Sequence, residues 1–227
     1  MDADLERDLC WRDSARPIDE LLSKPGGVVL LGSPGTGKTT LIKRLARSSA
    51  LGPETSTDRF PALPWCFPVV VLITLFDQKR DGQNVLAYIQ ASLKETTGEV
   101  LVEVFRRHWS NGECLVLLDG LDEVADIGRR IGCAREAGRF VQALGSNRAL
   151  ITSRIVGYSI CRLNVPVRHV YLQPFEKDDI DTFIRQWYVA YDRAVHRGAP
   201  KPTEAFRNAE SLIPSVPMYM RQPSMRN

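Results

Sequence analysis

The sequence lacks the cysteine and histidine patterns of a disulfide framework or a zinc site. It has only three histidines, and none stands at a metal-ligand spacing from a cysteine. The cysteines are odd in number and include no C-x-x-C pair. They are Cys10, Cys66, Cys114, Cys133 and Cys161. We therefore expect reduced and mostly buried thiols in a cytoplasmic protein.

The sequence also lacks a strong charge and a long apolar run. Its net charge of +3, from 30 Lys+Arg against 27 Asp+Glu, is too small to indicate nucleic acid or an anionic membrane as a partner. The longest apolar run, 67–76, is interrupted by Pro68 and is far shorter than the ~20 residues of a membrane helix. Because the first ten residues are acidic and polar, we expect no signal peptide. A soluble, cytoplasmic protein is predicted.

What the sequence does have is an alternation of short apolar runs and amphipathic stretches. The runs are apolar on both faces, which is typical of parallel strands covered on two sides. They lie at 28–31, 69–74, 115–118, 149–152 and 169–172. Helix-compatible stretches separate them at 39–48, 85–94, 101–109 and 134–144. This order predicts an α/β fold, a five-stranded parallel sheet flanked by helices, with ligands at the carboxyl ends of the strands.

The 227 residues suit one full domain and part of a second. We predict a helical lead-in over 1–24, a core domain over 25–174 with a surface loop at 51–64, and the start of a helical domain over 175–227. Asp178 and Asp179 would begin its first helix, whose apolar stripe recurs every three or four residues. The stripe comprises Ile180, Phe183, Ile184, Trp187, Tyr188 and Tyr191. The proline-containing tail from Ala199 shows no stop signal, so we expect the chain to be cut through this second domain.

A phosphate-binding loop follows the first predicted strand. The segment GSPGTGKTT matches G-x-x-x-x-G-K-[ST] and leads into a helix-compatible stretch. Its glycines allow main-chain N–H groups to surround an anion, and the helix start adds its positive dipole end. Lys38 would bridge the β- and γ-phosphates, and the Thr39 hydroxyl would be a ligand of Mg²⁺. The predicted nucleotide-binding residues are Gly32, Ser33, Pro34, Gly35, Thr36, Gly37, Lys38, Thr39 and Thr40.

Three carboxylates follow the third predicted strand in the run LVLLDGLDEV. Asp119 ends the strand and is expected to hold Mg²⁺, directly or through water. Asp122 and Glu123 complete the cluster, which repels itself unless a cation or shared proton neutralises it. One of them would orient an attacking water, and the sequence does not decide which. A solvated acidic turn is the alternative interpretation.

A candidate phosphate sensor follows the fourth predicted strand in ITSRIVGY. Arg154 stands at the carboxyl end of this strand and could reach the γ-phosphate or offset charge in the transition state. The alternative is an arginine that pairs with a surface carboxylate. We predict Arg154, together with Asp122 and Glu123, as the catalytic residues.

The motifs GSPGTGKTT, LVLLDGLDEV, LITSR and LQPF together resemble the NACHT group of signal-transduction P-loop NTPases. The resemblance covers roughly residues 10 to 190. It implies an added strand between the phosphate-loop strand and the Asp119 strand, with Arg154 as the phosphate sensor. It also implies a helical domain that closes over the nucleotide, with Pro214 and Pro217 as candidates for the family's base-contacting proline. Further sensor or effector domains are expected outside this chain.

The function implied is a nucleotide-binding switch and slow Mg²⁺-dependent NTP hydrolase that controls self-association in signalling or defence. ATP and ADP are the expected nucleotides, with GTP left open because no base-reading motif is recognisable. The activated form is expected to be a homo-oligomer. One alternative is an oligomerisation scaffold that binds ATP or ADP without significant hydrolysis. Another is a small-molecule phosphotransferase, which would need an arginine-rich lid and an acceptor pocket.

Overall fold

The computed structural model describes residues 16–51, 63–79, 82–173, 175 and 177–196. The chain divides into two compact units, Met1–Gln173 and Pro174–Asn227. Most of the predicted surface loop, Cys10, and the tail with its two candidate prolines lie outside the described residues.

A five-stranded parallel sheet forms the centre of the first unit. Its strands are β1 (Gly26–Leu31), β2 (Phe67–Leu72), β3 (Cys114–Asp119), β4 (Arg148–Ser153) and β5 (Arg168–Tyr171). Their order across the sheet is β2-β3-β4-β1-β5, and all neighbours run parallel. The predicted sheet is confirmed, including the strand that the resemblance implied between the phosphate-loop strand and the Asp119 strand.

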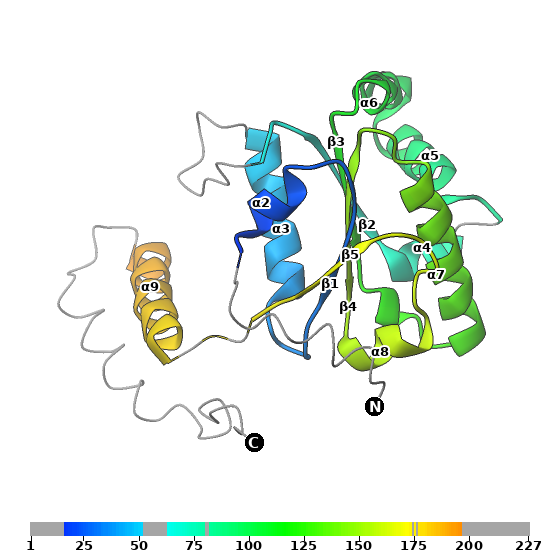
Figure 1. Cartoon of the computed structure of the whole chain (residues 1–227). Helices are drawn as coiled ribbons and strands as arrows, with labels where there is room; N and C mark the ends of the chain where they lie inside the picture. Colours follow the sequence, from blue (N-terminus) through cyan, green and yellow to red (C-terminus); the bar gives the residue numbers. More distant parts are fainter. Residues whose placement is uncertain (1–15, 52–62, 80–81, 174, 176, 197–227) are drawn as a thin grey trace. The chain divides into compact units, whose positions relative to one another are not determined.

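Helices cover both faces of this sheet (Figure 1). One face is covered by α2 (Ile18–Leu22) and α3 (Lys38–Leu51). The other is covered by α4 (Ile73–Lys79), α5 (Val85–Thr97), α6 (Glu99–Ser110) and α7 (Ile127–Gln142). Two short elements lie at strand ends, the 3₁₀ turn η1 (Leu121–Glu123) after β3 and α8 (Ile155–Ile160) after β4.

The hydrophobic core has two layers because successive strand residues point to opposite faces. Val28 and Leu30 of β1 pack in the layer beneath α2 and α3, and Val29 and Leu31 pack in the layer on the other side. All six residues of β3 are buried. Two-sided burial of β1, β3 and β4 explains why these strands are continuous apolar runs in the sequence. The expectation of cover on two faces is wrong for β2, where Val70 and Leu72 are exposed, and β5 is only partly buried.

The second strand ends earlier than the sequence predicts. The apolar run continues to Thr74, but β2 ends at Leu72, which pairs with Asp119 at the last position of β3. With no further partner along β3, the chain turns into α4, which buries Ile73 and Phe76 on one helical face.

Helix α7 begins seven residues before the predicted start at Ala134. The side chain of Asp126 caps it by accepting a hydrogen bond from the main-chain N–H of Arg129 at 2.7 Å. Ile127 and Ile131 in the added turns are exposed. The first turns therefore carry no apolar pattern that points to the core, and periodicity alone misses them.

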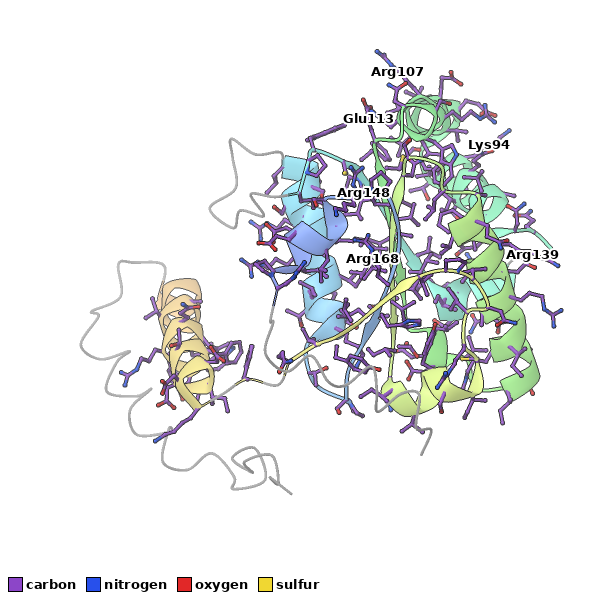
Figure 2. All side chains as sticks on the ribbon, viewed as in Figure 1. Lys94, Arg107, Glu113, Arg139, Arg148 and Arg168 are labelled. Carbon is purple, nitrogen blue, oxygen red and sulfur yellow. The ribbon has the colours of Figure 1, made fainter. Side chains whose placement is uncertain are left out.

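Two arginines at the starts of β4 and β5 hold the segment before β1 (Figure 2). Arg148 donates to the main-chain oxygens of Leu22 at 2.9 Å and Ser23 at 3.2 Å. Arg168 donates to the main-chain oxygen of Lys24 at 3.4 Å. These bonds fix residues 22–24 against the sheet, just before the strand that leads to the phosphate loop.

The four described cysteines, Cys66, Cys114, Cys133 and Cys161, are free and buried, as predicted. Burial raises the pKa of the Cys114 thiol to about 12. This thiol is therefore protonated at neutral pH and unreactive.

The described part of the second unit is mainly one long helix, α9 (Lys177–His196). It carries the predicted aromatic stripe, in which the rings of Trp187 and Tyr191 stack with their centroids 5.3 Å apart. Phe183, one turn earlier, contacts Phe175 before the helix, with centroids 6.1 Å apart. No helix within the described residues is long and apolar enough to span a membrane.

Candidate nucleotide site

The predicted phosphate loop connects β1 to the first turn of α3. Gly35 and Gly37 have positive φ angles of 76° and 94°, a region that side chains with a Cβ rarely adopt. Lys38 is the first residue of α3, so the free N–H groups of the helix start face the loop. The local backbone is therefore that of an anion-binding loop.

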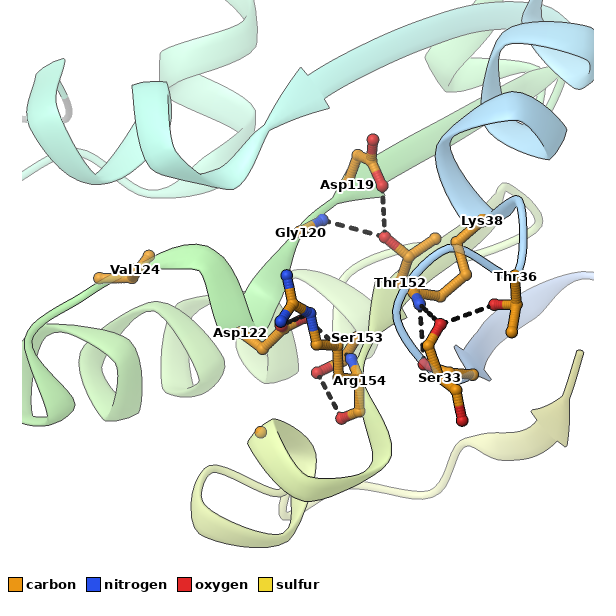
Figure 3. A network of polar contacts seen from close by, with 12 residues as sticks. Ser33, Thr36, Lys38, Asp119, Gly120, Asp122, Val124, Thr152, Ser153 and Arg154 are labelled. Atoms are coloured by element: carbon orange, nitrogen blue, oxygen red, sulfur yellow. Dashed lines mark hydrogen bonds and ion pairs between the residues drawn. The ribbon is translucent and has the colours of Figure 1, made fainter. Parts of the chain in front are cut away.

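The Lys38 ammonium group lies over its own loop. Its Nζ donates to the main-chain oxygens of Gly32 at 2.7 Å and Ser33 at 2.9 Å (Figure 3). Burial lowers the pKa of Lys38 from its ordinary value, while the negative charge of Asp122 acts in the opposite direction. Two carbonyl oxygens thus hold the ammonium group at the place where a phosphate oxygen could replace them.

The Asp119 carboxylate is fixed by a neighbouring strand. Asp119 is only 7% exposed, and its Oδ1 accepts a hydrogen bond of 2.5 Å from the Thr152 hydroxyl at the end of β4. The same hydroxyl accepts a hydrogen bond from the main-chain N–H of Gly120 at 2.9 Å. Thr152 therefore sets both the carboxylate and the turn that follows it (Figure 3). The sequence analysis missed this role of Thr152, which could have been suggested by a hydroxyl residue near the end of a buried strand.

The other two carboxylates lie in η1 but have different surroundings. Gly120, with φ of 82°, turns the chain into η1, and the Glu123 carboxylate folds back over it. A Cβ at Gly120 would lie 2.8 Å from Glu123 Cδ, at the movable end of that side chain, so it is the positive φ that favours glycine here. Glu123 is exposed, whereas the Asp122 side chain is 8% exposed and fully engaged. The structure thus separates two acids that are indistinguishable in the sequence.

Arg154 is the partner of Asp122. It follows the last residue of β4 and is the N-cap residue of α8. Its main-chain N–H donates to Asp122 Oδ1 at 2.8 Å, and its Nε forms an ion pair with Oδ2 at 3.0 Å. The arginine therefore pairs with a carboxylate, as in one of the two sequence interpretations, but that carboxylate belongs to the site itself.

These groups surround one pocket of about 300 Å³ at the carboxyl ends of β1, β3 and β4. Its lining residues are Pro34, Gly35, Gly37, Lys38, Thr39, Thr40, Asp119, Gly120, Asp122, Glu123, Thr152 and Arg154. Three predicted binding residues are not in the lining. Gly32 and Ser33 offer carbonyl oxygens to Lys38, and the Thr36 hydroxyl donates to the main-chain oxygen of Ser33 at 2.9 Å. They shape the loop.

Comparison with known families decides the identity of the chain. The family model of the NACHT domain matches residues 27–191, which include the whole pocket. The chain belongs to the NACHT domain family. A comparison with curated protein sequences gives no match.

Two solved structures show what the NACHT chain is similar to. A chain described as the crystal structure of DNA replication initiation factor is 14% identical, with a TM-score of 0.40 over 87% of this chain and 57% of that one. A chain of the E. coli MS115-1 HORMA:CdnC:Trip13 complex is also 14% identical, with a TM-score of 0.40 over 93% of this chain and 66% of that one. The NACHT chain thus spans 57% and 66% of these chains, and the similarities add nothing to the topology described above.

The donor set of the NACHT pocket fits Mg²⁺ better than a transition metal. Within the described ranges, no three His, Cys, Asp or Glu residues gather as a metal site. The pocket instead offers the Thr39 hydroxyl and one oxygen of Asp119, whose other oxygen is bound to Thr152. Mg²⁺ usually takes one or two carboxylates together with phosphate oxygens and water.

Proposed function

We propose that this NACHT chain is a nucleotide-binding switch that slowly hydrolyses ATP with Mg²⁺ and thereby controls self-association in signalling or defence. The observation that carries the nucleotide part is the convergence of Lys38, Asp119 and Arg154 on one pocket. Lys38 begins the helix that follows β1, Asp119 ends β3 and Arg154 follows β4, and these strands stand in the sheet order β3-β4-β1 although they are far apart in the chain. Membership of the NACHT domain family also supports nucleotide binding.

The phosphate loop and the start of α3 would bind the triphosphate. The main-chain N–H groups around Gly35 and Gly37 offer hydrogen bonds to phosphate oxygens. Lys38 would exchange the two carbonyl oxygens that hold it for β- and γ-phosphate oxygens. Because the acceptor is then charged as well as the donor, each new bond is stronger than a bond to a neutral carbonyl, and this exchange favours binding.

Thr39 and Asp119 would hold the Mg²⁺ ion of the nucleotide. When bound, Mg²⁺ neutralises charge on the phosphate oxygens. The hydrogen bond from Thr152 keeps the Asp119 carboxylate in one orientation. A preoriented carboxylate does not lose rotational freedom when the ion binds, so the site favours binding further.

Of the two acids in η1, Glu123 suits the role of orienting the attacking water. Its carboxylate is exposed toward the pocket that it lines, and no ion pair to it is found among the described residues. Asp122 already binds both the main chain and the side chain of Arg154. A general base needs a carboxylate oxygen that is available to the water, and both oxygens of Asp122 are already engaged by Arg154.

Two parts of the proposal go beyond the pocket. The preference for ATP over GTP rests on the family resemblance, because the pocket residues surround the phosphate loop and contain no base-reading motif. Self-association and the role in signalling or defence rest on the same resemblance. The localisation in the cytoplasm and the further sensor or effector domains likewise stay proposals.

Replacement of Glu123 by Gln tests the assignment. We expect E123Q to bind ATP with an affinity close to wild type and to lower kcat by about a hundredfold or more, because a positioned base contributes this much. Binding is measured by titration calorimetry and turnover by phosphate release. The matched control is E103Q, an equally conservative change at an exposed glutamate of α6. Wild-type turnover in E123Q would contradict the role.

The same variant tests the switch. ATP-loaded E123Q should form larger assemblies than the ADP-loaded protein in light scattering coupled to size-exclusion chromatography, because it retains the γ-phosphate. Identical masses with both nucleotides would contradict nucleotide control of self-association, while nucleotide binding itself would stand.

A further inference from the structure

Asp122 is held on both of its carboxylate oxygens by a single residue. Oδ1 accepts from the Arg154 main-chain N–H at 2.8 Å, and Oδ2 lies 3.0 Å from the Arg154 Nε (Figure 3). The Asp122 side chain is 8% exposed, whereas that of Arg154 is 53% exposed. The carboxylate is therefore the fixed partner and the guanidinium group is the one that extends toward solvent.

A glycine in α8 makes the space for this arrangement. A Cβ at Gly157 would lie 2.3 Å from Asp122 Cβ and 3.3 Å from its Cγ. Gly157 lies within the helix and is not among the glycines with positive φ, so its backbone conformation does not require glycine. Glycine is required here because Asp122 occupies the space of a side chain, and any larger residue would push Asp122 and η1 away from Arg154.

The contact leaves the outer part of the arginine available. Nε is the guanidinium nitrogen nearest the main chain, and an arginine paired through it keeps two terminal nitrogens as donors for a second anion. Arg154 also lines the pocket that contains the phosphate loop and Lys38. A guanidinium group anchored at its base can thus face a γ-phosphate with its outer edge.

We propose that Asp122 is a positioning residue that holds Arg154 toward the γ-phosphate, with Gly157 as the position that lets it do so. The inference rests on the proposed nucleotide site and deepens it. Without its anchor, a half-exposed arginine samples many rotamers, and binding a phosphate must first select one of them. Asp122 therefore acts on the preference for ATP over ADP through Arg154.

The test compares the affinities of the whole chain for Mg²⁺-ADP and for a Mg²⁺-bound, non-hydrolysable ATP analogue. In R154A we expect the ratio of the two affinities to fall about tenfold toward ADP, the scale for one partly exposed charge-assisted bond. In D122A the ratio should fall by a similar factor, and the double variant should fall no further than R154A. D122N, which keeps an acceptor for the main-chain N–H, serves if D122A does not fold.

G157A tests the same idea without changing a charge. Its Cβ displaces Asp122, so the affinity ratio should fall as in D122A. The matched control is G138A, whose Cβ would meet Val165 at an ordinary 3.5 Å and should leave the ratio unchanged. A purely structural role of Asp122 would weaken ADP and the ATP analogue equally.

Each remaining outcome is decisive. A wild-type affinity ratio in D122A or D122N would overturn the proposal, and lost turnover beside it would make Asp122 the acid that handles water. An unchanged ratio in R154A would overturn it while nucleotide binding stands. If the wild-type chain binds neither nucleotide, the proposed function itself fails, and this inference fails with it.

Discussion

Thr152 binds both the Asp119 carboxylate and the turn that begins at Gly120 through its hydroxyl group. It donates to Asp119 and accepts from the N–H of Gly120, and it is only 1% exposed. A hydroxyl in this position satisfies a buried carboxylate and a buried N–H at once. Its removal would leave both groups without this partner, which is costly in a buried place.

Replacement of Thr152 by Val should therefore affect the cation site and stability together. Valine keeps the shape but cannot hydrogen-bond, so we expect the free energy of unfolding to fall by about 2 kcal/mol. We also expect Mg²⁺-ATP affinity to fall more than Mg²⁺-free ATP affinity. Calorimetric titration with and without Mg²⁺ measures the second effect. T152S keeps the hydroxyl and is the control; equal losses in T152S and T152V would mean that packing, not the hydrogen bond, matters.

At individual positions, the sequence predicts residues whose spacing alone implies their chemistry. Lys38, Thr39 and Asp119 belong to runs in which the order of residues dictates a loop, a helix start or a strand end. Thr152 and Gly157 act on partners more than thirty residues earlier in the chain, Gly120 and Asp122. No local pattern encodes such a contact, and the separate surroundings of Asp122 and Glu123 escape prediction for the same reason.

Among the elements, the start of β3 depends on one buried asparagine between α7 and β4. The Asn147 side chain accepts from the N–H of Cys114 and donates to the main-chain oxygens of Trp109 and Leu144, each at 2.9 Å. It is 2% exposed. This side chain thus joins the end of α6, the start of β3 and the segment after α7.

Replacement of Asn147 by Ala should lower the free energy of unfolding by about 3 kcal/mol, because two buried hydrogen bonds and one partly buried hydrogen bond are lost. Urea unfolding followed by circular dichroism measures the change. The control is N164A at an exposed asparagine, for which we expect less than about 0.5 kcal/mol. A loss as small in N147A as in N164A would show that water replaces the side chain.

The existence of the strands could be predicted from the sequence, whereas the ends of strands and helices were harder to predict. β1, β3 and β4 appear as apolar runs because each is buried on both faces. β2 also appears as an apolar run although Val70 and Leu72 on one of its faces are exposed, and β5 is only partly buried. The end of β2 is set by the end of β3, and the first turns of α7 by the cap at Asp126. Neither a partner strand nor a cap on an exposed turn produces apolar periodicity, so both boundaries were misplaced.

On the scale of the whole molecule, the sheet order is what assembles the site. Placing β4 between β1 and β3 brings Thr152 beside Asp119 and Arg154 beside Asp122. The residue pattern alone predicts a parallel sheet but not its order; the family resemblance implied the place of β4 between β1 and β3, and the places of β2 and β5 were not predicted. Because ligands of such sheets bind at the carboxyl ends of the strands, the order also places the pocket at the phosphate loop.

The central claim is that this pocket holds a nucleotide through Lys38. The most direct measurement is to purify the chain without added nucleotide, denature it, and identify any released nucleotide by chromatography, followed by titration with ADP. We predict near-stoichiometric ADP from the wild-type chain, or binding of ADP when it is titrated, and neither in K38A. A wild-type chain that releases no nucleotide and binds none, or a K38A variant that binds as the wild type does, would contradict the account.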